Sequence, residues 1–331
     1  MANLSTSYAG LKLKNPLVIG SSSLTGNVNN LKKFEALGAS AVILKSIFEE
    51  EITNEFKKVI DEVDAKGEID QHVDYFDKKI KQDNIANYIQ LIKDAKKELS
   101  IPVIASINCI SAHEWTYFVQ KVEEAGADAI ELNIYYFPVD FELSSDEMEA
   151  KYLEIMKKVK AATNIPVIVK MSRYFTNMGA MIKAAAATGI NGIALFNRFY
   201  KPDIDLKTGA LKTASIFSVP QEYVIPLQWI ALMNEKVKIN MAASTGIHDG
   251  AAFVKLLLAG AHANYIVSAL FKNGFEVITE ILTYLENYLD ENGYSSVEEM
   301  IGKLNQSAIK NPKYYERAQF MRYFTGGKDV L

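Results

Sequence analysis

The chain has almost no cysteine and few histidines, which limits the chemistry it can carry. Cys109 is the one cysteine among 331 residues, so no internal disulfide can form and no thiolate metal cage can be built. The four histidines show neither HxH nor HExxH spacing, so we expect no metal site. Scarce cysteine suits a reducing compartment, and the sequence therefore predicts a cytoplasmic protein.

Long runs of basic residues and long runs of apolar residues are also missing. The 36 basic and 40 acidic residues leave a net charge of -4, and no run of Lys and Arg is long enough to track a phosphate backbone, so we expect no nucleic-acid partner. Nowhere do about eighteen apolar residues run together, and the N-terminus lacks a positive region followed by an apolar block. The sequence therefore predicts neither a membrane span nor an export signal.

Short apolar runs rich in Val, Ile and Ala are abundant instead. Each is bounded by Pro or Gly and is followed by a segment of helical period, and the near-continuous hydrophobicity indicates parallel strands that are covered on both faces. A weak internal repeat places a helix end, then a Gly, then a strand in the same order and spacing. It is seen in the segments EALGASAVIL, EEAGADAIEL, AAATGINGIAL and LLAGAHANYIV. The eight runs are residues 15–22, 41–46, 102–108, 129–135, 166–172, 192–198, 237–244 and 263–269.

Eight such units predict an α/β fold of the closed (β/α)₈ TIM-barrel type, with residues 1–331 as a single domain. The GxGxxG fingerprint of an open doubly wound sheet follows none of the runs. Three segments lie outside the repeat. SYAGLKLKN alternates apolar and polar residues and predicts an N-terminal hairpin at the barrel floor. Residues 47–81 form a charged rim insertion after the second strand, and residues 293–331 form a helical C-terminal extension whose aromatics favour a homodimer contact.

Polar residues close each apolar run, and barrel enzymes build their active sites at these strand ends. Lys45 and Lys170 end strands that are otherwise apolar, where a cation is costly unless an anionic ligand lies opposite. The strand-end set is Ser21, Ser22, Lys45, Ser46, Ser106, Asn108, Glu131, Asn133, Lys170, Ser172, Asn197, Arg198, Ser244, Thr245, Gly246 and Ser268.

The last two runs, ending in ASTGI and VSALF, each lead towards a helix, which is where barrels bind phosphate. We therefore expect a phosphorylated cofactor or substrate. A flavin is a flat heterocycle that takes hydrogen bonds from amides and hydroxyls, and a lysine beside it can stabilise the negative charge that develops on it. The strand-end residues therefore suit a flavin. A lyase or isomerase that uses Lys45 or Lys170 as an imine nucleophile on a phosphorylated metabolite is the alternative. The second lysine and the amides favour the flavin.

On these residues the sequence resembles the dihydroorotate dehydrogenase family, in particular its soluble class 1 branch, from LKLKNPLVIGSSS to about YSSVEEMIGKLN. The order and spacing of the matching elements around eight strands carry the resemblance. The elements are the opening NP, strand and Ser, the pair Lys45 and Ser46, the ELN of Glu131 to Asn133, the VK ending at Lys170, the FN ending at Asn197 and the block from Thr245 to Ala261.

The resemblance implies FMN as the cofactor and oxidation of a dihydropyrimidine, dihydroorotate to orotate in pyrimidine biosynthesis, with hydride passed to the flavin while a loop base removes a proton. Lys45, Asn133 and Asn197 would face this small-molecule substrate, and Lys45 and Lys170 would be catalytic. The cofactor contacts expected from the resemblance and the strand ends together are Ser21, Ser22, Lys45, Ser46, Ser106, Asn108, Asn133, Lys170, Ser244, Thr245, Gly246 and Ser268.

Two departures from the family pattern bear on catalysis. The family places a Cys or Ser base just before a Pro in the loop after ELN, whereas Tyr135, Tyr136 and Phe137 precede Pro138 here. Tyr136 is the candidate for proton transfer, although a tyrosine pKa of about 10 makes a poor base. The family's Asn-containing substrate loop has no counterpart in EVDAKGEIDQHVDYFDKK. A catalytically degenerate flavin-binding protein is therefore a further alternative, and fumarate, a nicotinamide and a partner protein stay open as electron acceptors.

Overall fold

The computed structural model describes residues 2–48, 73–109, 115–134 and 136–316. Within them, eight parallel strands form a barrel, and the ring closes because the second strand pairs with both the first and the third. Seven of the eight predicted runs contain one of these strands, and β6 extends one residue beyond the run 102–108, which confirms the (β/α)₈ TIM barrel. The strands are β3 (Leu17–Ile19), β4 (Ala41–Ile43), β6 (Val103–Cys109), β7 (Ala129–Ile134), β8 (Val167–Met171), β9 (Gly192–Leu195), β12 (Asn240–Ser244) and β13 (Ala263–Ile266).

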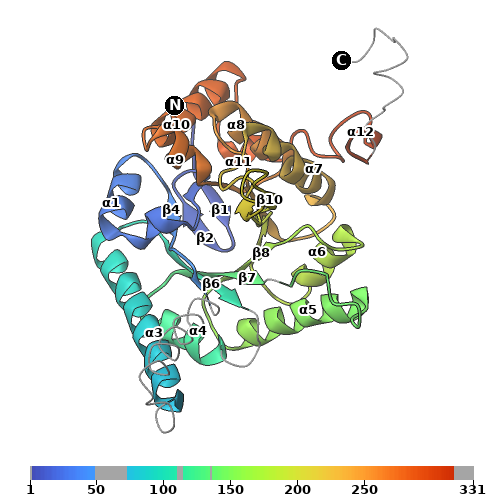
Figure 1. Cartoon of the computed structure of the whole chain (residues 1–331). Helices are drawn as coiled ribbons and strands as arrows, with labels where there is room; N and C mark the ends of the chain where they lie inside the picture. The colour runs from blue at the N-terminus through green and yellow to red at the C-terminus, as the bar shows by residue number, and fades with distance from the viewer. Residues whose placement is uncertain (1, 49–72, 110–114, 135, 317–331) are drawn as a thin grey trace.

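Helices surround the barrel (Figure 1). They follow the strands in alternation, which is why the outer faces of the strands are as apolar as the inner ones. The helices around the ring are α1 (Val28–Ala36), α3 (Val73–Glu98), α4 (Trp115–Glu124), α5 (Ser145–Ala161), α6 (Met178–Ala186), α7 (Val224–Met233), α8 (Gly250–Ala259), α9 (Ser268–Asn273) and α10 (Val277–Glu291).

The residues of each strand alternate between two hydrophobic clusters. On β7, Ile130 and Leu132 belong to the large cluster shared with the helices, whereas Ala129 belongs to a small cluster inside the barrel. Alanines dominate this inner cluster, and the rings of Tyr8 and Tyr265 fill the space that they leave. Because side chains alternate with a period of two, Glu131 and Asn133 point inward like Ala129.

The predicted N-terminal hairpin is present as β1 (Thr6–Tyr8) and β2 (Leu11–Leu13), which pair antiparallel. Tyr8 and Ala9 are buried against the start of β9, where a Cβ on Gly192 would lie 2.9 Å from the Ala9 Cβ. The hairpin therefore closes the amino-terminal end of the barrel, and the Tyr265 hydroxyl donates a hydrogen bond of 3.0 Å to the Tyr8 hydroxyl.

The segments predicted as additions to the barrel are described in part. Residues 49–72 of the rim insertion lie outside the described residues, β5 (Ile47–Phe48) pairs with β6, and α3 begins at Val73, so residues 73–81 belong to a barrel helix. The C-terminal extension contributes α11 (Val297–Met300) and α12 (Lys313–Glu316), and residues 317–331 lie outside the description. Of the helices that are described, none combines the length and the apolar character needed to cross a membrane.

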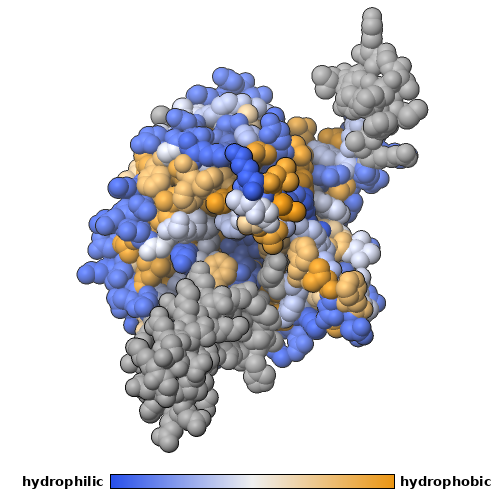
Figure 2. All heavy atoms as spheres, viewed as in Figure 1, coloured by the Kyte–Doolittle hydropathy of each residue, from blue (hydrophilic) through white to orange (hydrophobic). Residues whose placement is uncertain are grey.

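A further insertion follows β9. It contains the antiparallel pair β10 (Pro202–Ile204) and β11 (Leu211–Thr213) and the short 3₁₀ helix η3 (Pro220–Tyr223). Leu206 and Leu211 on this hairpin are exposed, and Figure 2 shows hydrophobic side chains on the same face of the molecule. This hairpin is not among the predicted elements, because its short exposed strands carry no buried apolar face.

Candidate active site

The carboxyl ends of the strands enclose a cavity of about 490 Å³. Barrel enzymes place their active sites at this end, and the volume falls in the range of small-molecule and cofactor sites. Of the residues predicted to bind cofactor or substrate, all except the buried Ser106 line the cavity. The predicted residues that line it are Ser21, Ser22, Lys45, Ser46, Asn108, Asn133, Lys170, Asn197, Ser244, Thr245, Gly246 and Ser268.

These side chains converge because they occupy inward positions of neighbouring strands. Asn133 on β7 is the register partner of Asn108 on β6 and of Lys170 on β8. Each lies two or four residues beyond an inward residue of the inner cluster, such as Ile104, Ala129 or Ile168. Strand register therefore places two amides and an ammonium side by side at one end of the barrel.

A chain of hydroxyls stands behind one wall of the cavity. The Ser21 and Ser46 Oγ atoms lie 3.0 Å apart, and the Ser46 and Ser106 Oγ atoms lie 2.7 Å apart. The Asn133 Nδ2 atom donates a hydrogen bond of 3.0 Å to the Ser106 Oγ. Ser106 is fully buried, so its role is to fix the orientation of the Asn133 amide rather than to meet a ligand directly.

Two buried polar atoms in the cavity-lining residues have no hydrogen-bond partner within the described residues. They are the Ser22 Oγ and the Asn108 Oδ1. Buried polar atoms in folded proteins are nearly always paired, so these two atoms are candidate contacts for a polar ligand. A donor and acceptor set of this kind fits the polar edge of a heterocyclic cofactor.

The turn after β12 packs so closely against the backbone of η3 that position 246 requires glycine. Gly246 has φ +79°, and a Cβ there would overlap the backbone nitrogen of Tyr223 and lie 2.7 Å from the carbonyl carbon of Glu222. Thr245 also has a positive φ of 89°. Tight turns that expose backbone N–H groups at this end of the last strands form anion sites in barrels.

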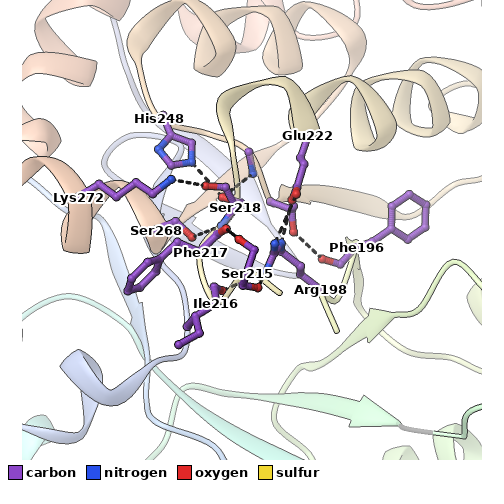
Figure 3. Close-up of polar contacts among 12 residues, drawn as sticks. Phe196, Arg198, Ser215, Ile216, Phe217, Ser218, Glu222, His248, Ser268 and Lys272 are labelled. Carbon is purple, nitrogen blue, oxygen red and sulfur yellow. Dashed lines mark hydrogen bonds and ion pairs between the residues drawn. The ribbon is translucent and has the colours of Figure 1, made fainter. Parts of the chain in front are cut away.

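Ser218, in the loop after β9, joins this turn to the first residue of α9 (Figure 3). The Gly246 N–H donates to the Ser218 Oγ at 3.3 Å, and the Ser218 N–H donates to the Ser268 Oγ at 3.0 Å. Lys272 donates to the Ser218 carbonyl at 2.9 Å, and the His248 Nε2 lies 2.9 Å from the Ser218 Oγ. Burial, assisted by Lys272, lowers the pKa of His248, so the ring is neutral at pH 7.

Arg198 holds the same loop at both of its ends. Its Nε lies 2.9 Å from a Glu222 carboxylate oxygen, and its Nη1 donates to the carbonyls of Ser215 and Ile216 at 3.0 Å each (Figure 3). Sequence reasoning noted Arg198 as a strand-end residue but missed this clamp and Ser218. The position of Ser218 just before Val219 and Pro220, at the start of a 3₁₀ helix, was the signal that could have found the loop.

Glu131 was predicted to lie on the rim, but the structure places it below the cavity. Its carboxyl group is completely buried, and the Lys170 Nζ lies 3.9 Å from its Oε1. Burial raises the pKa of Glu131, and the Lys170 charge acts in the opposite direction. Lys170, whose side chain is 11% exposed, lines the cavity above it.

Tyr136 is not among the residues that line the cavity. Its backbone N–H donates to the Tyr152 hydroxyl at 3.1 Å, and its ring packs edge-on against the Tyr152 ring, with centroids 5.5 Å apart. The Lys151 Nζ lies 6.0 Å from the centroid of the Tyr136 ring. The structure therefore turns the predicted proton acceptor towards α5, and Tyr135 lies outside the described residues.

The fold and the site together define a (β/α)₈-barrel protein with a polar cavity at the carboxyl ends of its strands, the arrangement of a barrel enzyme. Residues 3–289 match the family model of dihydroorotate dehydrogenase, and the chain belongs to that family. The family resemblance inferred from the strand-end motifs is thus confirmed, and with it an oxidoreductase of the dihydroorotate dehydrogenase type.

Curated relatives cover nearly the whole chain at low identity. The chain is 28% identical over 313 residues to the dihydroorotate dehydrogenase B (NAD(+)) catalytic subunit of Thermoplasma volcanium, covering 91% of this chain and 98% of the relative. The subunit of the same name from Pyrococcus abyssi is 28% identical over 308 residues, covering 90% and 98%. The NAD-dependent dihydropyrimidine dehydrogenase subunit PreA of Escherichia coli is 25% identical over 332 residues, covering 93% and 78%.

Proposed function

We propose that the protein is an FMN-dependent oxidoreductase that oxidises the CH–CH bond of a dihydropyrimidine-like substrate. The observation that carries the proposal is the convergence of Lys45, Asn133, Lys170 and Asn197 in one cavity that also reaches the Gly246 turn. Two cations, two amides and a tight glycine turn along one cavity suit a planar heterocycle that carries a phosphate.

The described residues fit this cofactor. The unpartnered Ser22 Oγ and Asn108 Oδ1 would meet the polar edge of the ring system. The phosphate would bind at Thr245, Gly246 and Ser268, where Ser218 already ties the two strand ends together. Bound FMN would supply the acceptor for the substrate's hydride.

The chain's own groups would do the remaining work. Lys170, at the floor of the cavity, would stabilise negative charge as it develops. Lys45 and Asn197 would orient an anionic substrate, and the Asn133 amide is held in position for it by Ser106. We assign Lys45 and Lys170 as the catalytic residues on this basis.

The placement of Tyr136 favours a second candidate function. Its ring packs against Tyr152 and not in the cavity, so the loop base of the family has no replacement from this residue. A chain that keeps the cofactor cradle without the base would bind flavin and ligand without turning over a dihydropyrimidine. The experiment below separates the two candidates.

The electron acceptor and the assembly are proposed from the relatives and the sequence. The relatives named catalytic subunit or dehydrogenase subunit carry NAD in their names, which supports electron transfer through a second chain to a nicotinamide. A homodimer, a cytoplasmic location and a role in pyrimidine biosynthesis complete the proposal.

The test is anaerobic reduction of the flavin-loaded protein. L-dihydroorotate, and in a separate cuvette dihydrouracil, is added to the holoprotein while the visible absorbance band of the flavin is followed, with Lys170→Met as the comparison. Bleaching by either compound in the wild type, slowed at least about a hundredfold in the variant, supports the enzyme. A flavin band that neither compound bleaches supports the second candidate. A folded protein that binds no flavin overturns both.

A further inference from the structure

Glu131 carries a buried carboxyl group that the proposed chemistry does not yet use. The strand β7 directs it inward between Ala129 and Asn133, and its side chain has no solvent exposure. Neither carboxyl oxygen has a hydrogen bond of good geometry within the described part of the chain, and the Tyr265 hydroxyl is the nearby polar group that acts on the carboxyl. A buried carboxylate that lacks good hydrogen bonds is costly, so its charge needs a compensating partner.

Lys170 is the charged side chain that faces Glu131 among the described residues. The separation of 3.9 Å between the Lys170 Nζ and the Glu131 Oε1 is too long for a hydrogen bond, so the interaction is one of charge. The Tyr265 hydroxyl lowers the pKa of Glu131, whereas the charge of Glu131 raises the pKa of the buried hydroxyls of Tyr8, Tyr88 and Tyr265. Burial raises the pKa of each of these tyrosines, so all three are neutral.

Strand register sets the vertical order of the pair. Ile168 is the register partner of Glu131, whereas Lys170 is the partner of Asn133. Glu131 therefore lies one layer deeper in the barrel than Lys170, and its charge acts on the ammonium from the side away from the cavity. Lys170 alone of the two lines the cavity.

We propose that Glu131 is a positioning residue for Lys170, whose ammonium it draws towards the barrel axis and whose charge it balances beneath the cofactor. This inference rests on the proposed function. It implies that the negative charge of Glu131 partly offsets the positive charge that Lys170 would present to a bound flavin. Loss of the negative charge of Glu131 should therefore favour reduction of the flavin, and loss of the positive charge of Lys170 should disfavour it.

The first test uses the protein without cofactor. The unfolding constants of the wild type, Glu131→Gln, Lys170→Met and the double variant are measured in urea at pH 7.5. Each substitution is expected to increase the unfolding constant relative to the wild type. If the two charges are coupled, the product of the two single-variant fold increases exceeds the fold increase of the double variant, and we expect this ratio to be about ten. This ratio falls towards one on acidification, because a protonated Glu131 no longer attracts the ammonium.

A matched control cycle uses Glu154→Gln and Lys158→Met, an exposed pair at 2.6 Å on α5, for which a ratio of about two is expected. Lys170→Gln also removes the charge, so it replaces Lys170→Met in the cycle if that variant does not fold, whereas Lys170→Arg keeps the charge and is the control that should leave the stability of the pair nearly unchanged. A ratio near one for Glu131 and Lys170 at pH 7.5 overturns the proposal, because a side chain that only fills space shows no charge coupling.

The second test uses the flavin-loaded protein at equilibrium with a reference redox dye. Glu131→Gln is expected to raise the ratio of reduced to oxidised flavin about tenfold, and Lys170→Met is expected to lower it. An unchanged ratio in Glu131→Gln overturns the inference and leaves the proposed function intact. A protein that shows the coupling in urea but binds no flavin overturns the proposed function, and the coupling of Glu131 to Lys170 then stands by itself.

Discussion

Replacement of Gly246 by alanine tests the closeness of the turn on which the proposed phosphate site depends. The glycine has φ +79°, and an added Cβ would overlap the Tyr223 nitrogen and approach the Glu222 carbonyl carbon to 2.7 Å. Both obstacles are backbone atoms of η3, so no side-chain rotation relieves them. The 3₁₀ helix and the turn must move apart instead.

The magnitude follows from two contributions. A residue with a Cβ in the left-handed region costs about 1–2 kcal/mol, and overpacking against fixed atoms costs about 1–3 kcal/mol. Gly246→Ala should therefore lower the free energy of unfolding by about 2–5 kcal/mol. Displacement of η3 also strains the Ser218 contacts to Gly246 and Ser268, so the affinity for FMN should fall at least about tenfold.

Gly209 supplies a matched control. It lies between β10 and β11 with φ +70°, and a Cβ there has no atom within 4 Å. Gly209→Ala should carry only the conformational cost of about 1–2 kcal/mol and leave FMN binding unchanged. The assay is urea unfolding of both variants with FMN titration by fluorescence quenching. Equal destabilisation by the two substitutions, with FMN affinity intact in Gly246→Ala, would show that the close contact of Gly246 with η3 does not shape the phosphate site.

Three further predictions concern single side chains. Tyr136→Phe should change the rate of flavin reduction by less than about twofold in stopped flow, because the hydroxyl does not line the cavity; a loss of about a hundredfold would restore Tyr136 as the base. Ser46→Ala should lower the unfolding free energy by about 1–3 kcal/mol in urea, since it removes the partner of two other serine hydroxyls; no change would show that this chain of hydroxyls is not needed. Burial raises the pKa of Glu131 above 4.5, so its contribution to stability is full below pH 4.5 and is lost as the pH rises through the folded value. The unfolding free energy of the wild type minus that of Glu131→Gln should therefore fall between pH 4.5 and pH 7.5 in urea titrations, and a difference that rises would contradict this sign.

The barrel and most of its rim were predictable because the signals were local. Strands such as β7 and β8 are covered on both faces, so they stand out as apolar runs, and an inward phase then follows from alternation. Lys45 and Lys170 were conspicuous because a cation ends an apolar run. Register between parallel strands does the rest, since it brings residues far apart in sequence to one end of the barrel.

The errors and omissions arose where packing between distant segments decides the outcome. Tyr136 lies two residues before a Pro, where the family has its catalytic loop. The ring and hydroxyl of Tyr152, on α5, hold Tyr136 against that helix. Glu131 carries a strand-end motif yet lies one layer too deep to reach the cavity. Ser218 belongs to no strand end, and only the folded structure brings it between Gly246 and Ser268.

Equilibrium titration of the purified apoprotein with FMN is the measurement to make first, since the proposed oxidoreductase activity depends on FMN binding in the cavity. We predict saturable binding of one FMN per chain, weakened by Gly246→Ala and unaffected by Gly209→Ala. A folded protein whose flavin fluorescence and absorbance remain those of free FMN, at protein concentrations far above the micromolar range, would contradict it.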